Sequence, residues 1–117
     1  MTNTENFGYL GYNFQLKILN LIITDKLFAQ SIIDSIQSKY FDNQYFKLIM
    51  QMMKEYYEKY QSIPSFEGIE QLTQLEISSE MAKKCVIDML RDVKEASFED
   101  HLFIKEKTIK FCKQQEL

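Results

Sequence analysis

Residues that interrupt helices are rare in this chain, whose 117 positions include three glycines and one proline. Turn-rich β folds need many of both residues, so their scarcity disfavours a sheet protein. The chain also has seven Tyr, nine Phe and six Met within a hydrophobic content of 45%. That is more than a disordered chain carries and is sufficient for a core. The sequence therefore predicts one compact, all-α domain.

The first two predicted helices are rich in aliphatic residues. Between Phe14 and Ile23, apolar side chains occur almost all the way round a helical wheel, which is typical of a helix buried on most sides. Asp25 follows at a position suited to an N-cap, because its carboxylate can accept from the free N–H groups of a second helix over Leu27 to Ile36. The many Ile residues here would also suit a strand. Polar residues nevertheless recur at helical spacing, so we predict helix.

The third predicted helix follows Asp42 as its N-cap and carries an aromatic and Met stripe on one face. The stripe consists of Tyr45, Phe46, Ile49, Met50, Met53, Tyr56, Tyr57 and Tyr60. Such a stripe could stack bases or line a cofactor site, but these residue types at helical spacing pack in a core far more often. The chain then breaks at Ser62-Ile63-Pro64, and Ser65 can cap a short fourth helix.

The C-terminal part predicts two long helices. Ser78 or Ser79 can cap a fifth helix, and Ser97 with Asp100 is similar to a capping box. That pattern places a turn before a sixth helix that begins at Phe98, and a short turn favours antiparallel packing. The predicted architecture is a small helical head of about four helices over residues 13–76, followed by a long antiparallel helical hairpin over 77–117. Residues 1–12 are predicted to be a flexible N-terminal segment.

The sixth predicted helix is apolar on two sides. Leu102, Ile109 and Cys112 cluster on one side, while Ile104 and Phe111 lie roughly opposite when each residue advances by ~100°. A sister helix covers one of these sides, so the other is available for self-association or for a partner protein. The residues expected at this interface are Val86, Leu90, Val93, Leu102, Ile104, Ile109 and Phe111. The alternative is a single compact bundle in which both sides are internal.

Motifs for catalysis are absent from the sequence, which lacks GxxxxGK[ST], GxSxG and HExxH. The single histidine, His101, has no catalytic partner nearby in sequence and is expected to be an ordinary surface residue. Cys85 and Cys112 lack metal-ligand spacing, so we expect two reduced, buried thiols. The sequence thus predicts no catalytic residue, no metal site and no cofactor.

Charge suggests a second hypothesis for the last helix. The formal net charge of -3 gives no overall attraction to nucleic acid. Lys105, Lys107, Lys110 and Lys113 are opposed only by Glu106 in this segment, so the helix could follow a phosphate backbone or could simply be a solvated face. The first residues lack a signal peptide, and no apolar run reaches the roughly 20 residues of a membrane helix. We therefore expect a cytoplasmic protein with no membrane partner.

Several hydrophobic motifs in this order resemble the N-terminal domain of replicative hexameric DNA helicases of the DnaB type, in the branch carried by tailed phages. They are Gln15-Leu-Lys-Ile18-Leu19-Asn-Leu-Ile22-Ile23-Thr-Asp25, Phe41-Asp42 with Ile49 and Tyr56-Tyr57, Ser62-Ile63-Pro64 with Leu72, and Phe111-Cys112-Lys113. The resemblance covers most of the chain. None of these motifs is a catalytic signature.

The resemblance implies a non-catalytic assembly domain. In that family a helical head and hairpin associate with other subunits, as a dimer or hexamer ring, and offer a surface to the primase or the helicase loader. It also implies that the natural chain continues past Leu117 into an ATPase domain, which would explain why the last helix lacks a stop signal, and that DNA contact by this domain is weak or absent. A phage-encoded chain would act in the host cytoplasm. The alternative is a free-standing nucleic-acid-binding or adaptor protein that uses the basic last helix.

Overall fold

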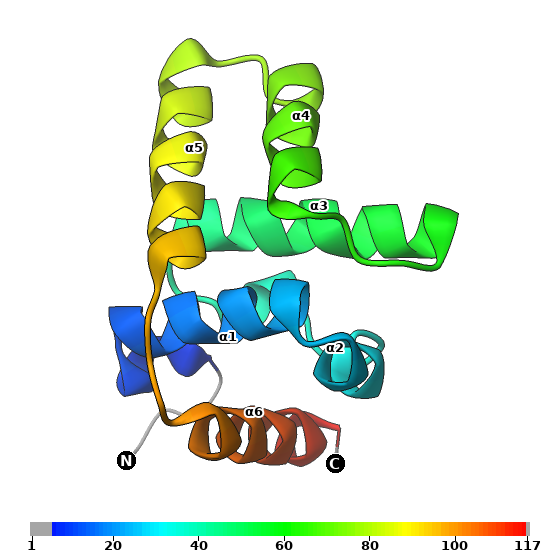
Figure 1. Ribbon diagram of the computed structural model, residues 1–117, viewed down its shortest axis with the longest axis vertical. Coiled ribbons are helices and arrows are strands. Elements are labelled where there is room, and N and C mark those ends of the chain that lie inside the picture. Colours follow the sequence, from blue (N-terminus) through cyan, green and yellow to red (C-terminus); the bar gives the residue numbers. More distant parts are fainter. Residues whose placement is uncertain (1–5, 117) are drawn as a thin grey trace.

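The computed structural model describes residues 6–116, and within this range the chain is helical with no strand (Figure 1). The elements are η1 (Phe7–Leu10), α1 (Tyr12–Thr24), α2 (Lys26–Ile32), η2 (Ser38–Tyr40), α3 (Gln44–Tyr60), α4 (Phe66–Glu76), α5 (Glu80–Glu95) and α6 (His101–Gln115). The predicted all-α class is confirmed. Residues 1–5 of the predicted flexible segment, and Leu117, lie outside the described residues.

The core is built around α1, which contacts α2, α5, α6 and η1. Ile18, Leu19 and Ile22 are fully buried, as expected for a helix that is apolar on most sides. Phe7 of η1 is also completely buried. Residues 7–10 therefore belong to the packed fold, although the sequence predicted a flexible segment there.

The predicted hairpin of the fifth and sixth helices is not what the structure shows. The fifth helix, α5, packs against α3, α4 and α1, whereas α6 packs against α1 and α2. Figure 1 shows α5 along the long axis of the molecule and α6 crossing beneath α1 at the opposite end from the α4–α5 connection. The antiparallel neighbour of α5 is thus α4. These two helices pack together across residues 76 and 77, where the sequence predicted the boundary between the helical head and the hairpin.

Side chains of α1 contact both the end of α5 and the residue that precedes α6. Between the two helices, residues 96–100 form no helix, so α6 begins at His101 and not at Phe98 as predicted. Asn20 of α1 donates from Nδ2 to the Val93 carbonyl at 3.0 Å, near the end of α5. Lys17 of α1 then pairs with Asp100 at 3.4 Å, at the start of α6. The first contact ties the last turn of α5 to α1, and the second ties the residue before α6 to α1.

Three of the predicted helix caps are confirmed. Asp25 accepts from the Phe28 N–H at 3.0 Å, Ser65 accepts from Gly68 at 3.0 Å, and Ser79 accepts from Ala82 at 3.2 Å. These bonds satisfy N–H groups that have no partner inside their own helices. The helix predicted over Leu27 to Ile36 was too long at its C-terminal end, because α2 ends at Ile32.

The predicted cap of α3 was one residue away from the real one. Asn43 caps the helix by accepting from the Tyr45 N–H at 2.8 Å. Asp42 instead accepts from Nε2 of the buried Gln15 at 2.9 Å, and its own N–H donates to Gln15 Oε1 at 3.1 Å. This pair ties α1 to the segment before α3.

The aromatic and Met stripe of α3 lies partly in the core. In its first half, Tyr45 is half-buried and the next four members, Phe46, Ile49, Met50 and Met53, are buried. Further along, Tyr56 and Tyr57 are half-buried and Tyr60 is 56% exposed. The predicted core role is therefore confirmed for the first half of the stripe. None of the described helices is long and apolar enough to cross a membrane.

Candidate association surface

Aromatic packing fixes the inner face of α6. The Phe111 ring lies 4.5 Å from the Phe7 ring and 5.1 Å from the Tyr40 ring, measured between centroids. Ile104, Thr108 and Cys112 are buried on the same face, and the Thr108 hydroxyl donates to the Ile104 carbonyl at 2.7 Å. A buried hydroxyl satisfied within its own helix needs no other partner. The inner face is therefore complete inside a single chain.

A charged contact fixes the orientation of α6 about its own axis. Lys105 donates to Asp25, the N-cap residue of α2, and both side chains are 27% exposed. The hydrogen bond from Lys105, followed by the one from the Phe28 N–H, lowers the pKa of Asp25 below its ordinary value. Because the ammonium group of Lys105 is paired with Asp25, it is not available to a ligand. Lys107, Lys110 and Lys113, the other predicted basic residues, have no such ion pair among the salt bridges of the described residues.

The structure corrects most of the predicted interface. Val86, Leu90, Val93, Ile104 and Phe111 are at most 2% exposed, so they belong to the core of this chain. They cannot contact another molecule unless the fold opens. Leu102 and Ile109 are the predicted interface residues that remain at the surface, exposed and half-buried respectively. The predicted side with Ile104 and Phe111 is therefore internal. On the other predicted side Leu102 and Ile109 remain at the surface, but Cys112 is buried with the inner face.

The free side is continuous along the helix, and we call it the outer face of α6. It comprises Leu102, Phe103, Glu106, Lys107, Ile109, Lys110, Lys113 and Gln114. Leu102 is 72% exposed and Phe103 is 50% exposed. Phe103 rests edge-on against Phe14 at 6.3 Å, and Lys107 Nζ lies 5.8 Å from the Phe103 ring. Apolar groups left in water on one helix face are typical of a docking surface.

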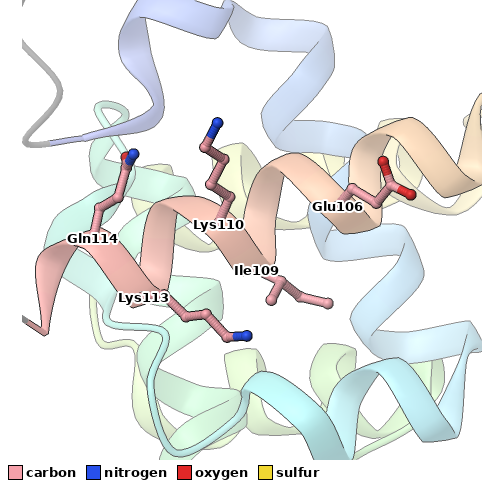
Figure 2. A pocket seen from close by; sticks show the side chains of 5 residues that line it. All are labelled: Glu106, Ile109, Lys110, Lys113 and Gln114. Carbon is pink, nitrogen blue, oxygen red and sulfur yellow. The ribbon is translucent and has the colours of Figure 1, made fainter.

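A shallow groove of about 490 Å³ follows the C-terminal half of this face. Its lining residues, Glu106, Ile109, Lys110, Lys113 and Gln114, all come from α6. Figure 2 shows Lys110 and Gln114 extending to one side of the helix and Ile109 with Lys113 extending to the other. The wall of the groove is mostly apolar, because Ile109 and the lysine stems form it while the ammonium groups point outward.

The basic residues predicted for nucleic-acid contact divide into two groups. Lys107, Lys110 and Lys113 are exposed on the outer face, whereas Lys105 is paired with Asp25. A second small hollow beside the helix brings Tyr9, which is 51% exposed, next to Lys107 and Lys110. Sequence reasoning missed Tyr9 and Phe103. Phe103 could have been found from its helical spacing with Lys107 and Lys110, because this spacing places the three residues on one face.

The histidine and the two cysteines have surroundings that are typical of residues with a structural role. His101 is exposed, and its Nε2 lies 3.0 Å from the Phe98 carbonyl. Burial, with a smaller effect of Glu116, raises the pKa of the Cys112 thiol to about 12, so this thiol is protonated at neutral pH. Cys85 is half-buried. Between residues 6 and 116, no group of three or more His, Cys, Asp or Glu side chains is arranged to hold a metal ion.

Comparisons with known proteins return no match for this chain among protein-family models, curated proteins or solved structures.

Proposed function

We propose that this chain is a non-catalytic association domain that binds copies of itself through the outer face of α6. The observation that carries the proposal is the difference between the two sides of that helix. The inner face completes the core, whereas Leu102 and Phe103 stay in water at 72% and 50% exposure. A second protein surface would remove these side chains from water, which is the main favourable term in association.

The groove beside Ile109 gives this face a shape that a partner side chain could fill. Apolar anchors surrounded by longer polar side chains are the usual composition of a protein–protein contact. Here Ile109 is flanked by Lys110 and Lys113, which can exclude water around an anchor while keeping their charges at the rim. The same features suit a protein better than a small ligand, because the groove is open and shallow.

The more specific form of the proposal places the domain at the N-terminus of a DnaB-type replicative helicase. This form rests on the hydrophobic motifs alone. The associated subunits would form the collar of a ring, and the primase or the loader would bind the assembled domain. Since α5 and α6 do not form a hairpin here, the outer face of α6 takes the role that the hairpin has in the resemblance.

The association proposal is tested by the mass of the isolated domain in solution. Leu102→Asp with Ile109→Asp is expected to reduce a wild-type oligomer to monomers while helicity by circular dichroism stays unchanged. Leu27→Asp is a matched control, because Leu27 is 77% exposed on α2, outside the outer face. Light scattering that shows an unchanged mass for the double variant, or a monomeric wild type at every concentration, would contradict the proposal.

The helicase form has a separate test in the source gene. Sequencing past the codon for Leu117 should reveal a continuing reading frame with GxxxxGK[ST] after a predicted strand. An immediate stop codon would remove the helicase form and leave the association domain.

A second candidate function is binding of single-stranded nucleic acid. The observation that favours it is the grouping of Lys107 and Lys110 with the exposed Tyr9, since single strands are bound by cations combined with aromatic stacking. This function predicts binding to single-stranded DNA that weakens with salt and is lost in Lys107→Glu with Lys110→Glu. No binding at low salt would exclude it.

A further inference from the structure

A cleft lies at the junction of α1, α2 and α3, apart from the outer face of α6. It has a volume of about 390 Å³ and is lined by the end of α1, by α2, by the last turn of α3 and by residues 61–63. Figure 1 shows α2 and the C-terminal end of α3 on the same side of the molecule. The groove beside Ile109 is lined by one helix alone, whereas several packed elements form this cleft. Hollows between packed elements are the usual sites of small ligands.

Apolar side chains from several of these elements meet in the cleft. Ile22, near the end of α1, is completely buried. Ile23, Tyr57 and Ile63 are half-buried and pack against the hydrophobic core of the chain. The cleft therefore has an apolar floor that continues the core, and a ligand with an aliphatic part would cover this floor from water.

The polar side chains of the cleft supply hydrogen-bond donors and one positive charge. Lys26 and Gln30 lie one turn apart on α2, and both are exposed at the rim. Within residues 6–116, neither side chain forms an ion pair or a hydrogen bond, and the same is true of the Tyr57 hydroxyl. Asp25, which precedes Lys26, is already paired with Lys105. Since no acidic residue of this range lines the cleft, its polar groups suit an anion.

The segment after α3 holds one wall of the cleft in a fixed shape. Between residues 6 and 116, Gln61 is the one non-glycine residue with a positive φ, at 56°, in the left-handed region that favours glycine. Its side-chain Nε2 donates to the carbonyls of Tyr57 at 3.2 Å and Glu58 at 3.3 Å. Pro64 then restricts Ile63 to extended backbone. A wall that is fixed before the ligand arrives lowers the ordering cost of binding.

We propose that this cleft binds a small carboxylate with an aliphatic body. The Lys26 ammonium and the Gln30 amide donate to the carboxylate at the rim, while the body lies on the three isoleucines. A phosphate suits the site less, because it carries up to two charges and Lys26 is the one cation among the described lining residues. The same chemistry occurs in a free aliphatic acid and in the C-terminal residue of a peptide. The inference goes beyond the proposed association, because no residue of the outer face of α6 lines the cleft.

The probe for the free acid is 4-methylpentanoate, titrated into the isotope-labelled chain and followed by NMR. We expect saturable shifts of the backbone amides around the cleft, with a dissociation constant in the millimolar range that is usual for so small a ligand. Acetate lacks the aliphatic body, and 4-methylpentanamide lacks the charge. Both are expected to bind at least about fivefold more weakly, because each loses one of the two recognised features. Equal binding of the amide would overturn the assignment of an anion site.

A pair of lysine variants locates the binding site. Lys26→Gln removes the cation of the cleft, and the dissociation constant of 4-methylpentanoate is expected to rise about fivefold. Lys47→Gln is the matched control, because Lys47 is also exposed, does not line the cleft, and its replacement gives the same net charge. The control should bind like the wild type. Circular dichroism checks that both variants keep the wild-type helicity.

A second probe separates the two sources of the carboxylate. It is an acetylated tripeptide that ends in leucine, compared with the same peptide as its C-terminal amide. Tighter binding of 4-methylpentanoate assigns the cleft to a free acid, and tighter binding of the peptide acid assigns it to a chain terminus. The absence of saturable shifts with both probes, or equal affinities of Lys26→Gln and the wild type, would overturn the inference. Neither result depends on whether the chain associates through α6.

Discussion

Both faces of α6 contain large apolar residues, but these residues have different roles. Ile104, Phe111 and Cys112 on the inner face are at most 2% exposed, whereas Leu102 and Phe103 on the outer face are at least 50% exposed. The apolar content of a helix therefore does not say which side stabilises the fold. What separates the faces is the set of neighbours, since Phe7 and Tyr40 cover Phe111 and nothing within residues 6–116 covers Leu102 to the same degree.

The largest expected effect is on the inner face. Phe111→Ala removes a ring that contacts Phe7 and Tyr40, and it should lower the free energy of unfolding by about 3–5 kcal/mol through lost burial and the cavity that remains. Urea denaturation followed by circular dichroism measures this change. A loss below about 1 kcal/mol would mean that the inner face of α6 contributes little to the core.

A smaller effect is expected where α6 meets α2. Asp25→Ala removes both the N-cap bond to the Phe28 N–H and the partner of Lys105, and it should lower the free energy of unfolding by about 1–2 kcal/mol. Asp25→Asn is the control, because its side-chain oxygen can still cap the helix while the charge is absent. An equal loss in both variants would show that the ion pair, and not the cap, stabilises this contact.

The stability that Asp25 provides also depends on pH. Its pKa is lowered in the folded state, so its contribution is fully present above the unfolded pKa of about 3.9 and is lost as the pH falls through the folded value. The difference in stability between wild type and Asp25→Ala should therefore shrink below about pH 4. A constant difference over this range would contradict a contribution from the charged carboxylate.

Local features of the sequence were sufficient to predict the helices and several of their caps. The scarcity of Gly and Pro fixes the class, and Asp25, Ser65 and Ser79 cap helices because capping depends on residues only a few positions apart. The contact between Asp42 and Gln15 was not predicted, because it joins residues 27 positions apart. Local spacing contains no information about such a pair.

The arrangement of α5 and α6 could not be predicted for the same reason. A short connection favours antiparallel helices, but Asn20 of α1 contacts the end of α5, Lys17 of α1 contacts Asp100, and α6 packs on α1 and α2. The candidate site was predicted in part. Helical spacing found Leu102 and Ile109, but it could not show that Phe7 covers Phe111, nor that Lys105 is held by Asp25.

The smallest effect on stability is expected on the outer face. Leu102→Ala should change the free energy of unfolding by no more than about 0.5 kcal/mol, because a side chain that is 72% exposed has few contacts to lose. The urea titration should be run at a protein concentration low enough for the domain to be monomeric, since binding to another copy would stabilise the folded state. A loss above about 1 kcal/mol would show that Leu102 already packs within the monomer, and the free apolar side of α6 would then be part of the fold.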